Sequence, residues 1–501
     1  MRSRPGSAER PAAARPATPG APWRPPEPDE DLPGGPMPPV DAWLYRHQAD
    51  GAICMTFGML ARFQGPPPAL GALRDRVRER WCGLPRLRAV PLEHPWPHWT
   101  STRKAPDPGV HVVDHTGRAP GRLPAQPVPV PAPVADRADA LAATLLAQPL
   151  DSDDGGTGGA GNSLSGNGLS RDGSHRTEGA GDGAAGTAPV PPWRLHLLPA
   201  ADGFALLLRA HHALLDGKAL ITLFRILLDG PGSYPLPPAA AHLAEPLALP
   251  PAPLPAQLRA AARLLPTGRR LPFHTPVDEG RALARSEVPV AALRAARRAL
   301  PGEPASVNSV FLAAVAAALG ATGALGSRPG RPGVHAMVPV DLRSPLDEAF
   351  LGNHYATVRL PLPTAPALAP PDRLAAVDAS SRRATRHRLG AAQALMVSRS
   401  PRRRGAVRDA FARYADSPRH SSLLCTNVRS GAAALSLGDA TLDRLALVPA
   451  LSPAHPLALS LTTHGATAVV AALTDAAHAP LGASLADGVR DAVLALRAAS
   501  P

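Results

Sequence analysis

The chain has 501 residues, with 53 Lys and Arg against 40 Asp and Glu, and a formal net charge of +13. This length predicts two domains with sizeable cores rather than one small module. Only 4% of the residues are aromatic and no basic stripe carries interleaved aromatics, so we expect no nucleic-acid partner. The three cysteines, Cys54, Cys82 and Cys425, lie far apart, which argues against a disulfide framework or a metal site and favours a cytoplasmic setting.

The first 200 residues alternate between segments that can fold and segments that cannot. Residues 1–35 are rich in Pro, Arg and Ala and predict a disordered arm, because they cannot bury enough apolar surface. Folding is expected from about Val40, with a strand over 53–63 and a helix over 69–82. Residues 151–189 are rich in Gly, Ser and Asp and predict a flexible insertion. Within it, Gly181 to Gly186 formally matches a dinucleotide fingerprint, but no strand precedes it and no helix follows, so we reject that match.

Beyond the insertion, the pattern predicts a strand from Pro192 to Leu197, a buried strand over 203–210 and a helix over 219–228. A proline-rich stretch then predicts a boundary between two mixed α/β lobes. The domains expected are an N-terminal lobe at 36–245, a connection at 246–275 and a C-terminal lobe at 276–501. The C-terminal lobe should contain a long Ala-rich helix opening at Ser306 and strands at 334–342, 355–362 and 469–473.

The densest basic stretches are Arg382, Arg383, Arg386 and Arg388, followed by Arg402 to Arg404. A solvated helix face is the ordinary explanation of such a stretch, and contact with phosphates or a membrane surface is the alternative. No uninterrupted apolar segment reaches membrane-spanning length.

The heptapeptide His211-His212-Ala213-Leu214-Leu215-Asp216-Gly217 lies between a predicted strand and a predicted helix. Chance would place this pattern roughly 0.005 times in a chain of this composition. An isolated histidine here would most often be satisfied in a core turn, but the complete pattern favours a functional ring. Gly217 would let the backbone turn without a Cβ clash.

Further motifs stand in a fixed order around the heptapeptide. They are Val40-Asp41-Ala42-Trp43, Leu84-Pro85-Arg86-Leu87-Arg88, Ser306-Val307-Asn308, Val338-Pro339-Val340-Asp341-Leu342-Arg343, Leu351-Gly352-Asn353 and Thr426-Asn427-Val428. With them the chain resembles the bacterial wax ester synthase/diacylglycerol acyltransferase family, in the chloramphenicol acetyltransferase and condensation-domain superfamily. It departs from the family pattern at Pro191-Pro192-Trp193, Asn308-Ser309 and Asn427-Val428-Arg429-Ser430, which bears on the acceptor more than on the chemistry.

The resemblance implies two chloramphenicol acetyltransferase-like lobes with a tunnel between them. It makes His212 the general base, a task that suits an imidazole with an ordinary pKa near 6.5. His211 would then shape the turn, and Asp216 would pair with Arg343 of the other lobe rather than serve as a triad partner. Asn308 and Asn353 would orient substrate or cap helices.

By the same resemblance, acyl-CoA is the co-substrate and no further cofactor or metal is expected. The acceptor would be diacylglycerol or a long-chain alcohol, met at a membrane or lipid-droplet surface that the protein contacts peripherally. The chain has no Gly-x-Ser-x-Gly elbow, so direct transfer is preferred to an acyl-enzyme. Two alternatives stay open: a condensation-like enzyme that acylates a specialised metabolite to an ester or amide, and a catalytically silent lipid-binding relative.

Overall fold

The computed structural model describes residues 34–51, 53–93, 96–102, 104–117, 136–150, 190–230, 248–265, 268–326, 333–400 and 405–499. Most of the predicted arm, the predicted insertion at 151–189 and Arg402 to Arg404 therefore lie outside the described residues. Regular structure begins before Val40, because Gly35 and Pro36 (β1) already pair with β4.

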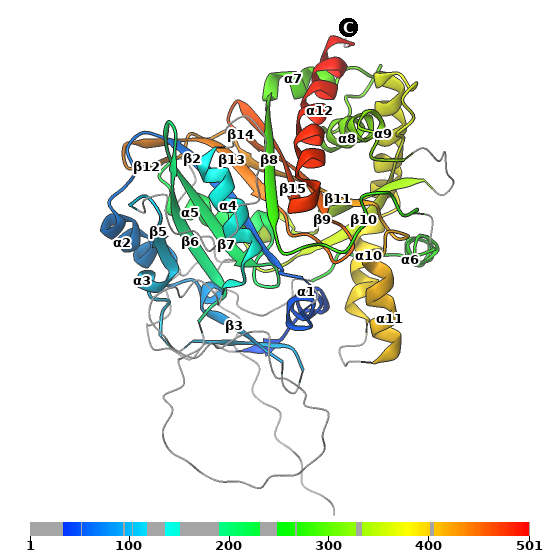
Figure 1. The fold of residues 1–501 in the computed structure, drawn as a ribbon. Coiled ribbons are helices and arrows are strands. Elements are labelled where there is room, and N and C mark those ends of the chain that lie inside the picture. Colours follow the sequence, from blue (N-terminus) through cyan, green and yellow to red (C-terminus); the bar gives the residue numbers. More distant parts are fainter. Residues whose placement is uncertain are drawn as a thin grey trace, which may run out of the picture.

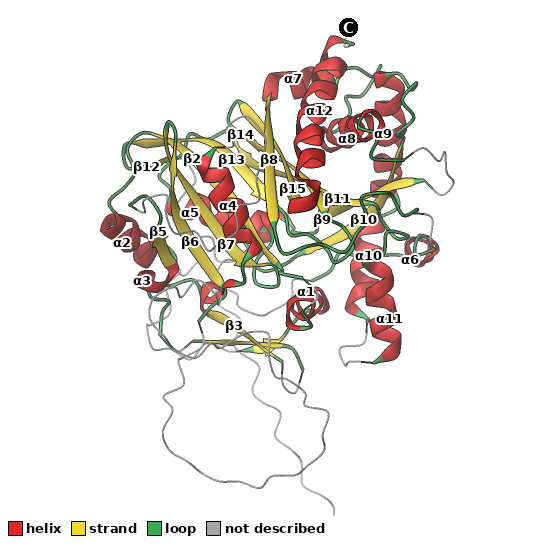
Figure 2. Cartoon of the chain, viewed as in Figure 1, coloured by secondary structure: helices red, strands yellow, loops and turns green. Residues whose placement is uncertain are grey.

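The first lobe is built on a six-stranded sheet in the order β12-β13-β2-β7-β6-β5 (Figures 1 and 2). All neighbouring strands in it are antiparallel except β5 and β6. Its strands are β2 (Thr56–Gln64), β5 (Val112–Asp114), β6 (Trp193–Ala200), β7 (Gly203–His211), β12 (Ser436–Leu437) and β13 (Ala440–Val448). Its helices are α1 (Pro39–Ala49), α2 (Leu70–Arg80), α3 (Pro108–His111), α4 (Arg137–Ala147) and α5 (Gly217–Leu227). A small sheet of β1, β4 (His98–Ser101) and β3 (Ala89–Leu92) lies beside it.

The second lobe is built on a six-stranded mixed sheet in the order β10-β9-β11-β14-β15-β8. Its strands are β8 (Arg281–Pro289), β9 (Val334–Asp341), β10 (Tyr355–Leu362), β11 (Leu423–Gly431), β14 (Leu457–His464) and β15 (Thr467–Asp475). Its helices are α6 (Leu254–Ala262), α7 (Val290–Ala296), α8 (Val307–Ala321), α9 (Pro370–Arg386), α10 (Leu389–Ser398), α11 (Ala406–Ala415) and α12 (Ala479–Ala498). In Figure 1, α12 lies along β8 and β15 beside α8. Within the described chain, no helix is both long and apolar enough to cross a membrane.

The predicted mixed α/β class is confirmed, and the elements that sequence periodicity indicates form close to their expected positions. The strand that leads into the histidines, β7, is almost wholly buried, because it pairs with β2 on one side and β6 on the other. Ser306 begins α8 as expected, and its side chain accepts a hydrogen bond from the Ser309 backbone N–H as the N-cap.

One feature of the topology differs from the predicted division at 276–501. Strands β12 and β13 come late in the chain but belong to the first sheet, where β13 pairs antiparallel with β2. The pairing buries Leu442, Leu445 and Leu447 in the core of the first lobe. Residues 436–448 are thus part of the first lobe, and the two lobes are joined by this exchange as well as by the chain before α6.

Candidate active site

The double histidine lies where β7 ends and the chain turns into α5. The His211 backbone N–H donates to the Pro192 carbonyl at 3.0 Å, and that of His212 donates to the Met55 carbonyl at 2.9 Å. These bonds continue the pairing of β7 with both its neighbours for one or two residues beyond the regular ladder. The backbone that carries the two rings is therefore fixed by the sheet.

The His212 ring stacks on Phe57 of β2, with ring centroids 4.3 Å apart and planes 13° apart. Tyr355, at the start of β10 in the second lobe, has its ring centroid 6.0 Å from that of His212. His212 is partly exposed, but its Nδ1 is enclosed without a hydrogen-bond partner among the described residues. Burial lowers the pKa of His212 below its ordinary value, although its own carbonyl, Asp216 and Asn353 act in the opposite direction. At neutral pH the ring is therefore neutral and able to accept a proton.

The His211 ring points into protein and stabilises the turn. Its Nδ1 accepts a hydrogen bond of 3.1 Å from the Ala213 backbone N–H. Burial, followed by the neighbouring His212, lowers the pKa of His211 to about 3. A ring so enclosed and so weakly basic fits the expectation that His211 shapes the turn.

Asp216 begins α5 and joins it to the second lobe. One carboxylate oxygen accepts a hydrogen bond of 2.9 Å from the Ala219 N–H, which caps the helix. The other accepts from the Arg343 guanidinium at 2.8 Å and from the His354 backbone N–H at 3.2 Å. Asp216 thus pairs with the arginine that the family resemblance indicated, and its contacts are those of a structural group.

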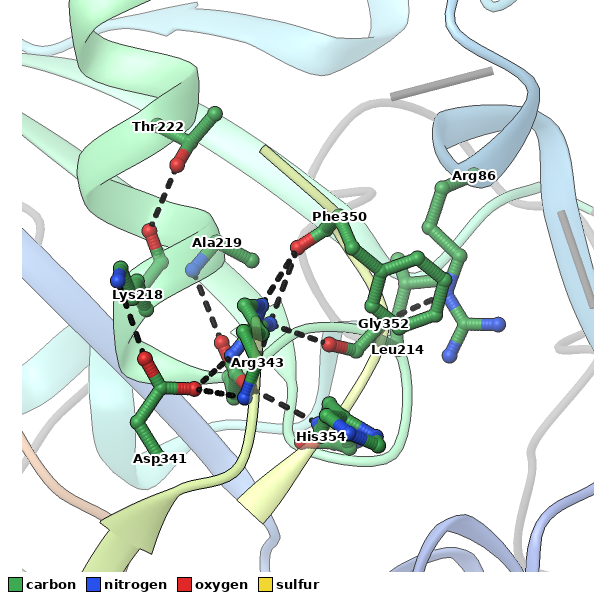
Figure 3. A network of polar contacts seen from close by, with 12 residues as sticks. Arg86, Leu214, Lys218, Ala219, Thr222, Asp341, Arg343, Phe350, Gly352 and His354 are labelled. Carbon is green, nitrogen blue, oxygen red and sulfur yellow. Dashed lines mark hydrogen bonds and ion pairs between the residues drawn. The ribbon is translucent and has the colours of Figure 1, made fainter. Parts of the chain in front are cut away.

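Arg343 is the centre of the network in Figure 3. Besides Asp216, its guanidinium donates to the carbonyls of Phe350 and Gly352 and to the Asp341 carboxylate. Burial alone would lower the pKa of Arg343, but Asp216 and Asp341 outweigh it and raise the pKa above its ordinary value. Lys218 of α5 adds a second tie between the lobes, a 3.0 Å ion pair with Asp341. These contacts hold residues 341–354 of the second lobe against the loop that carries the histidines.

Asn353 reaches from that segment to the backbone of the histidine loop. Its Nδ2 lies 2.8 Å from the His212 carbonyl, 3.0 Å from the Ala213 carbonyl and 3.0 Å from the Asp41 carboxylate. Its Oδ1 is buried without a partner among the described residues. Asn353 therefore positions the residue that carries the His212 ring.

A buried ion pair supports the same loop from the first lobe. Arg86 pairs with Asp41 at 2.9 Å, and both side chains are almost fully buried. The Arg86 guanidinium also donates to the carbonyls of Leu214 at 2.7 Å and Ala213 at 3.1 Å. Burial raises the pKa of Asp41, with Arg86 opposing the rise. Three consecutive carbonyls, those of residues 212–214, thus accept side-chain hydrogen bonds.

Two sequence expectations change in detail. Gly217 does not have a positive φ, so the turn does not require a glycine backbone, and a Cβ there would make a tight 3.0 Å contact with the Leu447 side chain of β13. Asn308 does not cap α8, since Ser306 does so, and among the described residues Asn308 makes no hydrogen bond to the His212 loop. Its expected role with substrate stays a prediction, as does the tunnel between the lobes.

Sequence reasoning did not pick out Asp41, Arg86, Phe57 or Tyr355 as site residues. For Asp41 and Arg86 a signal was present, because each is a charged residue inside an otherwise apolar stretch, Val40–Trp43 and Leu84–Leu87. Nothing in the sequence marks Phe57 or Tyr355, since core packing is the ordinary explanation of an aromatic residue in a strand.

The arrangement presents one partly exposed, neutral imidazole on a loop whose backbone is fixed from both lobes. Such a group can accept a proton from a bound hydroxyl or amine and return it to a leaving group. Among the described residues, no cluster of His, Cys, Asp or Glu could hold a metal ion.

The comparisons with known proteins agree with this architecture. Residues 351–497 match the family model described as WS/DGAT C-terminal domain. No curated protein matches the chain significantly. The resemblance stated from the motifs is thus confirmed in the second lobe by an independent match.

Solved structures of similar fold cover nearly the whole chain. A wax ester synthase/diacylglycerol acyltransferase from Marinobacter aquaeolei VT8 superimposes with a TM-score of 0.58 at 18% identity, over 92% of this chain and 98% of that one. A trichothecene 15-O-acetyltransferase, TRI3, from Fusarium sporotrichioides gives 0.57 at 12% identity, over 92% and 95%. A mutant starter condensation domain of rhizomide synthetase RzmA, in complex with C8-CoA and Leu-SNAC, gives 0.56 at 14% identity, over 93% and 95%. At these identities the likeness establishes the fold.

Proposed function

We propose that this chain, an acyltransferase of the wax ester synthase/diacylglycerol acyltransferase type by its C-terminal domain and fold, transfers a long-chain acyl group from acyl-CoA to the hydroxyl of diacylglycerol or a fatty alcohol. The observation that carries the proposal is the His212 ring, neutral and partly exposed at the junction of the two lobes. Acyl-CoA as donor is supported by the similar condensation domain that was crystallised with C8-CoA.

In the proposed reaction, the acceptor oxygen attacks the thioester carbonyl while its proton passes to His212. The tetrahedral intermediate then collapses, the C–S bond breaks, and the imidazolium returns the proton to the leaving thiolate. The products are an ester and free CoA, so atoms and charge balance without an acyl-enzyme. Positioned base catalysis of this kind contributes about 10²- to 10⁴-fold.

The proton is expected at His212 Nε2, because Nδ1 is the enclosed nitrogen. A basic Nε2 requires that Nδ1 carry the ring hydrogen and find an acceptor. Among the groups that raise the pKa of His212, its own backbone carbonyl acts most strongly, ahead of Asp216 and Asn353, so this carbonyl is the proposed acceptor. Asn353, whose Nδ2 donates to the same carbonyl, would then hold the acceptor in place.

The test is transfer from palmitoyl-CoA to a panel of acceptors, with products identified by mass spectrometry. We expect ester products with diacylglycerol or hexadecanol, and a loss of at least about a hundredfold in kcat for His212→Ala with unchanged circular dichroism. His211→Gln serves as the matched control, because it alters the adjacent ring and should act mainly on stability. Full turnover by His212→Ala would refute the base.

The acceptor panel includes a long-chain amine and a sterol. An amide as the main product would replace the proposal with a condensation-like reaction. Binding of palmitoyl-CoA without turnover of any acceptor would instead identify a silent lipid-binding relative.

A further inference from the structure

Helix α6 is attached to the protein along one face only. Ala256 and Ala260, 2% and 3% exposed, pack against Ala392 of α10. Leu254, Leu258 and Leu265 are by contrast 65%, 62% and 64% exposed. Among the large apolar side chains of the described residues, only Leu346 is more exposed.

The exposed leucines form a stripe. At about 100° per residue, Leu254 and Leu258 lie about 40° apart on α6, on the side away from the alanines that face α10. Leu265 lies in the turn just past the end of the helix and is exposed to a similar extent. Single exposed apolar residues are ordinary on protein surfaces, but three exposed leucines in one short segment, none of them packed against a described residue, are not.

Arginines surround this stripe. Arg259 lies on α6 itself, and the four charged groups that act most strongly on the neighbouring His387 are Arg259, Arg386, Arg263 and Arg383. Arg388 donates to the Pro251 carbonyl before α6, and Arg399 donates to Gln257 within it, so both ends of α10 place an arginine beside the helix. Arg259, Arg383, Arg386, Arg388 and Arg399 are all exposed. Part of the basic stretch at 382–388 thus lies beside α6.

The composition of this surface favours lipid over a protein partner. Protein interfaces draw their energy mostly from Trp, Tyr and Arg, and leucine is under-represented among their hot spots. An aliphatic stripe with arginines at its sides matches the helix that lies in the plane of a membrane, where leucines enter the acyl boundary and arginines reach phosphate headgroups.

We propose that the α6 surface, made of Leu254, Leu258 and Leu265 with Arg259, Arg383 and Arg386, docks the protein on an anionic phospholipid surface. Docking itself does not depend on the reaction, whereas its purpose, delivery of a lipid acceptor, rests on the proposed function. In Figure 1 this helix lies at the outer edge of the second lobe, beside α10.

Co-sedimentation of the full chain with unilamellar vesicles tests the proposal. The vesicles are phosphatidylcholine alone or phosphatidylcholine with phosphatidylglycerol, at low and high salt. We expect tighter binding to the mixed vesicles, weakened by salt. The triple variant L254Q/L258Q/L265Q should lose about a hundredfold or more in partition coefficient, because each leucine transferred from water contributes roughly tenfold.

The triple variant R259Q/R383Q/R386Q should lose roughly fivefold per arginine on mixed vesicles and little on phosphatidylcholine alone. Its matched control is R294Q/R298Q/R497Q, which changes the net charge equally at exposed positions of α7, the turn after it and α12. The single variant Leu258→Gln should lose about tenfold in partition coefficient, and Leu346→Gln is its control, since it removes an exposed leucine elsewhere. Both controls should bind vesicles as the unaltered protein does.

Failure of the unaltered protein to bind either vesicle, or equal loss in variants and controls, would overturn the proposal. Concentration-dependent self-association that is abolished by the leucine variant, without vesicle binding, would overturn it in favour of a protein interface. His212→Ala should bind vesicles normally, so a failed reaction and a failed docking surface are distinguishable.

Discussion

The ion pair between Asp216 and Arg343 gives the sharpest test of how the site is held. The two groups are 2.8 Å apart with side chains 6% and 1% exposed. Removing one partner of a buried pair costs about 3–5 kcal/mol, because the other charge stays buried. In Asp216→Asn, Arg343 still donates hydrogen bonds to Asp341 and two backbone carbonyls. In Arg343→Met, Asp216 still accepts hydrogen bonds from two backbone N–H groups. Each variant should therefore lower the free energy of unfolding by about 3 kcal/mol, the lower end of that range.

The double variant separates the pair from its surroundings. With both charges removed, the total loss should be smaller than the sum of the single losses by about 2 kcal/mol. Asp216→Ala should cost about 1 kcal/mol more than Asp216→Asn, since alanine also removes the N-cap of α5 while asparagine retains it. Urea denaturation followed by circular dichroism measures each value. Single losses that add within about 0.5 kcal/mol would refute the coupling.

Measurements of kcat distinguish a structural role of Asp216 from a role as direct partner of His212. As a structural group, Asp216→Asn should keep more than about a tenth of kcat at temperatures where it is fully folded, whereas His212→Ala loses at least about a hundredfold. An equally inactive but fully stable Asp216→Asn would instead make the carboxylate a direct partner of the base.

Two further predictions concern the same loop and the buried histidines. Asn353→Leu should lower kcat about tenfold or more with little change in KM, because the His212 carbonyl would lose the hydrogen bond that Asn353 donates to it; steady-state kinetics checks this, and a change in KM alone would contradict it. Burial, followed by the charge of Arg194, lowers the pKa of His111 to about 3. The unfolded state therefore binds an extra proton at His111 between pH 6.5 and about 3, and His111 should contribute about 4–5 kcal/mol to the loss of stability in that window, in addition to the loss from His211. Denaturation of the unaltered protein and of His111→Gln across this range measures the effect, and an unchanged pH slope in the variant would exclude His111 as its source.

Local pattern was enough for the elements and for part of the site. A continuous apolar run predicted β7, an Ala-rich stretch opening at Ser306 predicted α8, and the family motifs indicated Arg343 as the partner of Asp216. The convergence of Asp41, Arg86 and Asn353 on one backbone loop was beyond such reasoning, because the three residues are contributed by segments far apart in sequence. The same holds for Phe57, whose contact with His212 depends on the register of β2 against β7.

The position of β13 in the first sheet was likewise hidden, and it bears on how the site works. Strand pairing depends on which edge is free in space, which no local window of the sequence contains. Because β13 pairs with β2 while β14 continues in the second sheet, the two lobes are tied by chain exchange. Asp216, Asn353 and Lys218 then join them at the histidine loop itself. The His212 ring is therefore oriented by contacts between the lobes that are already formed without substrate, and a group oriented in advance loses less entropy when the reaction begins.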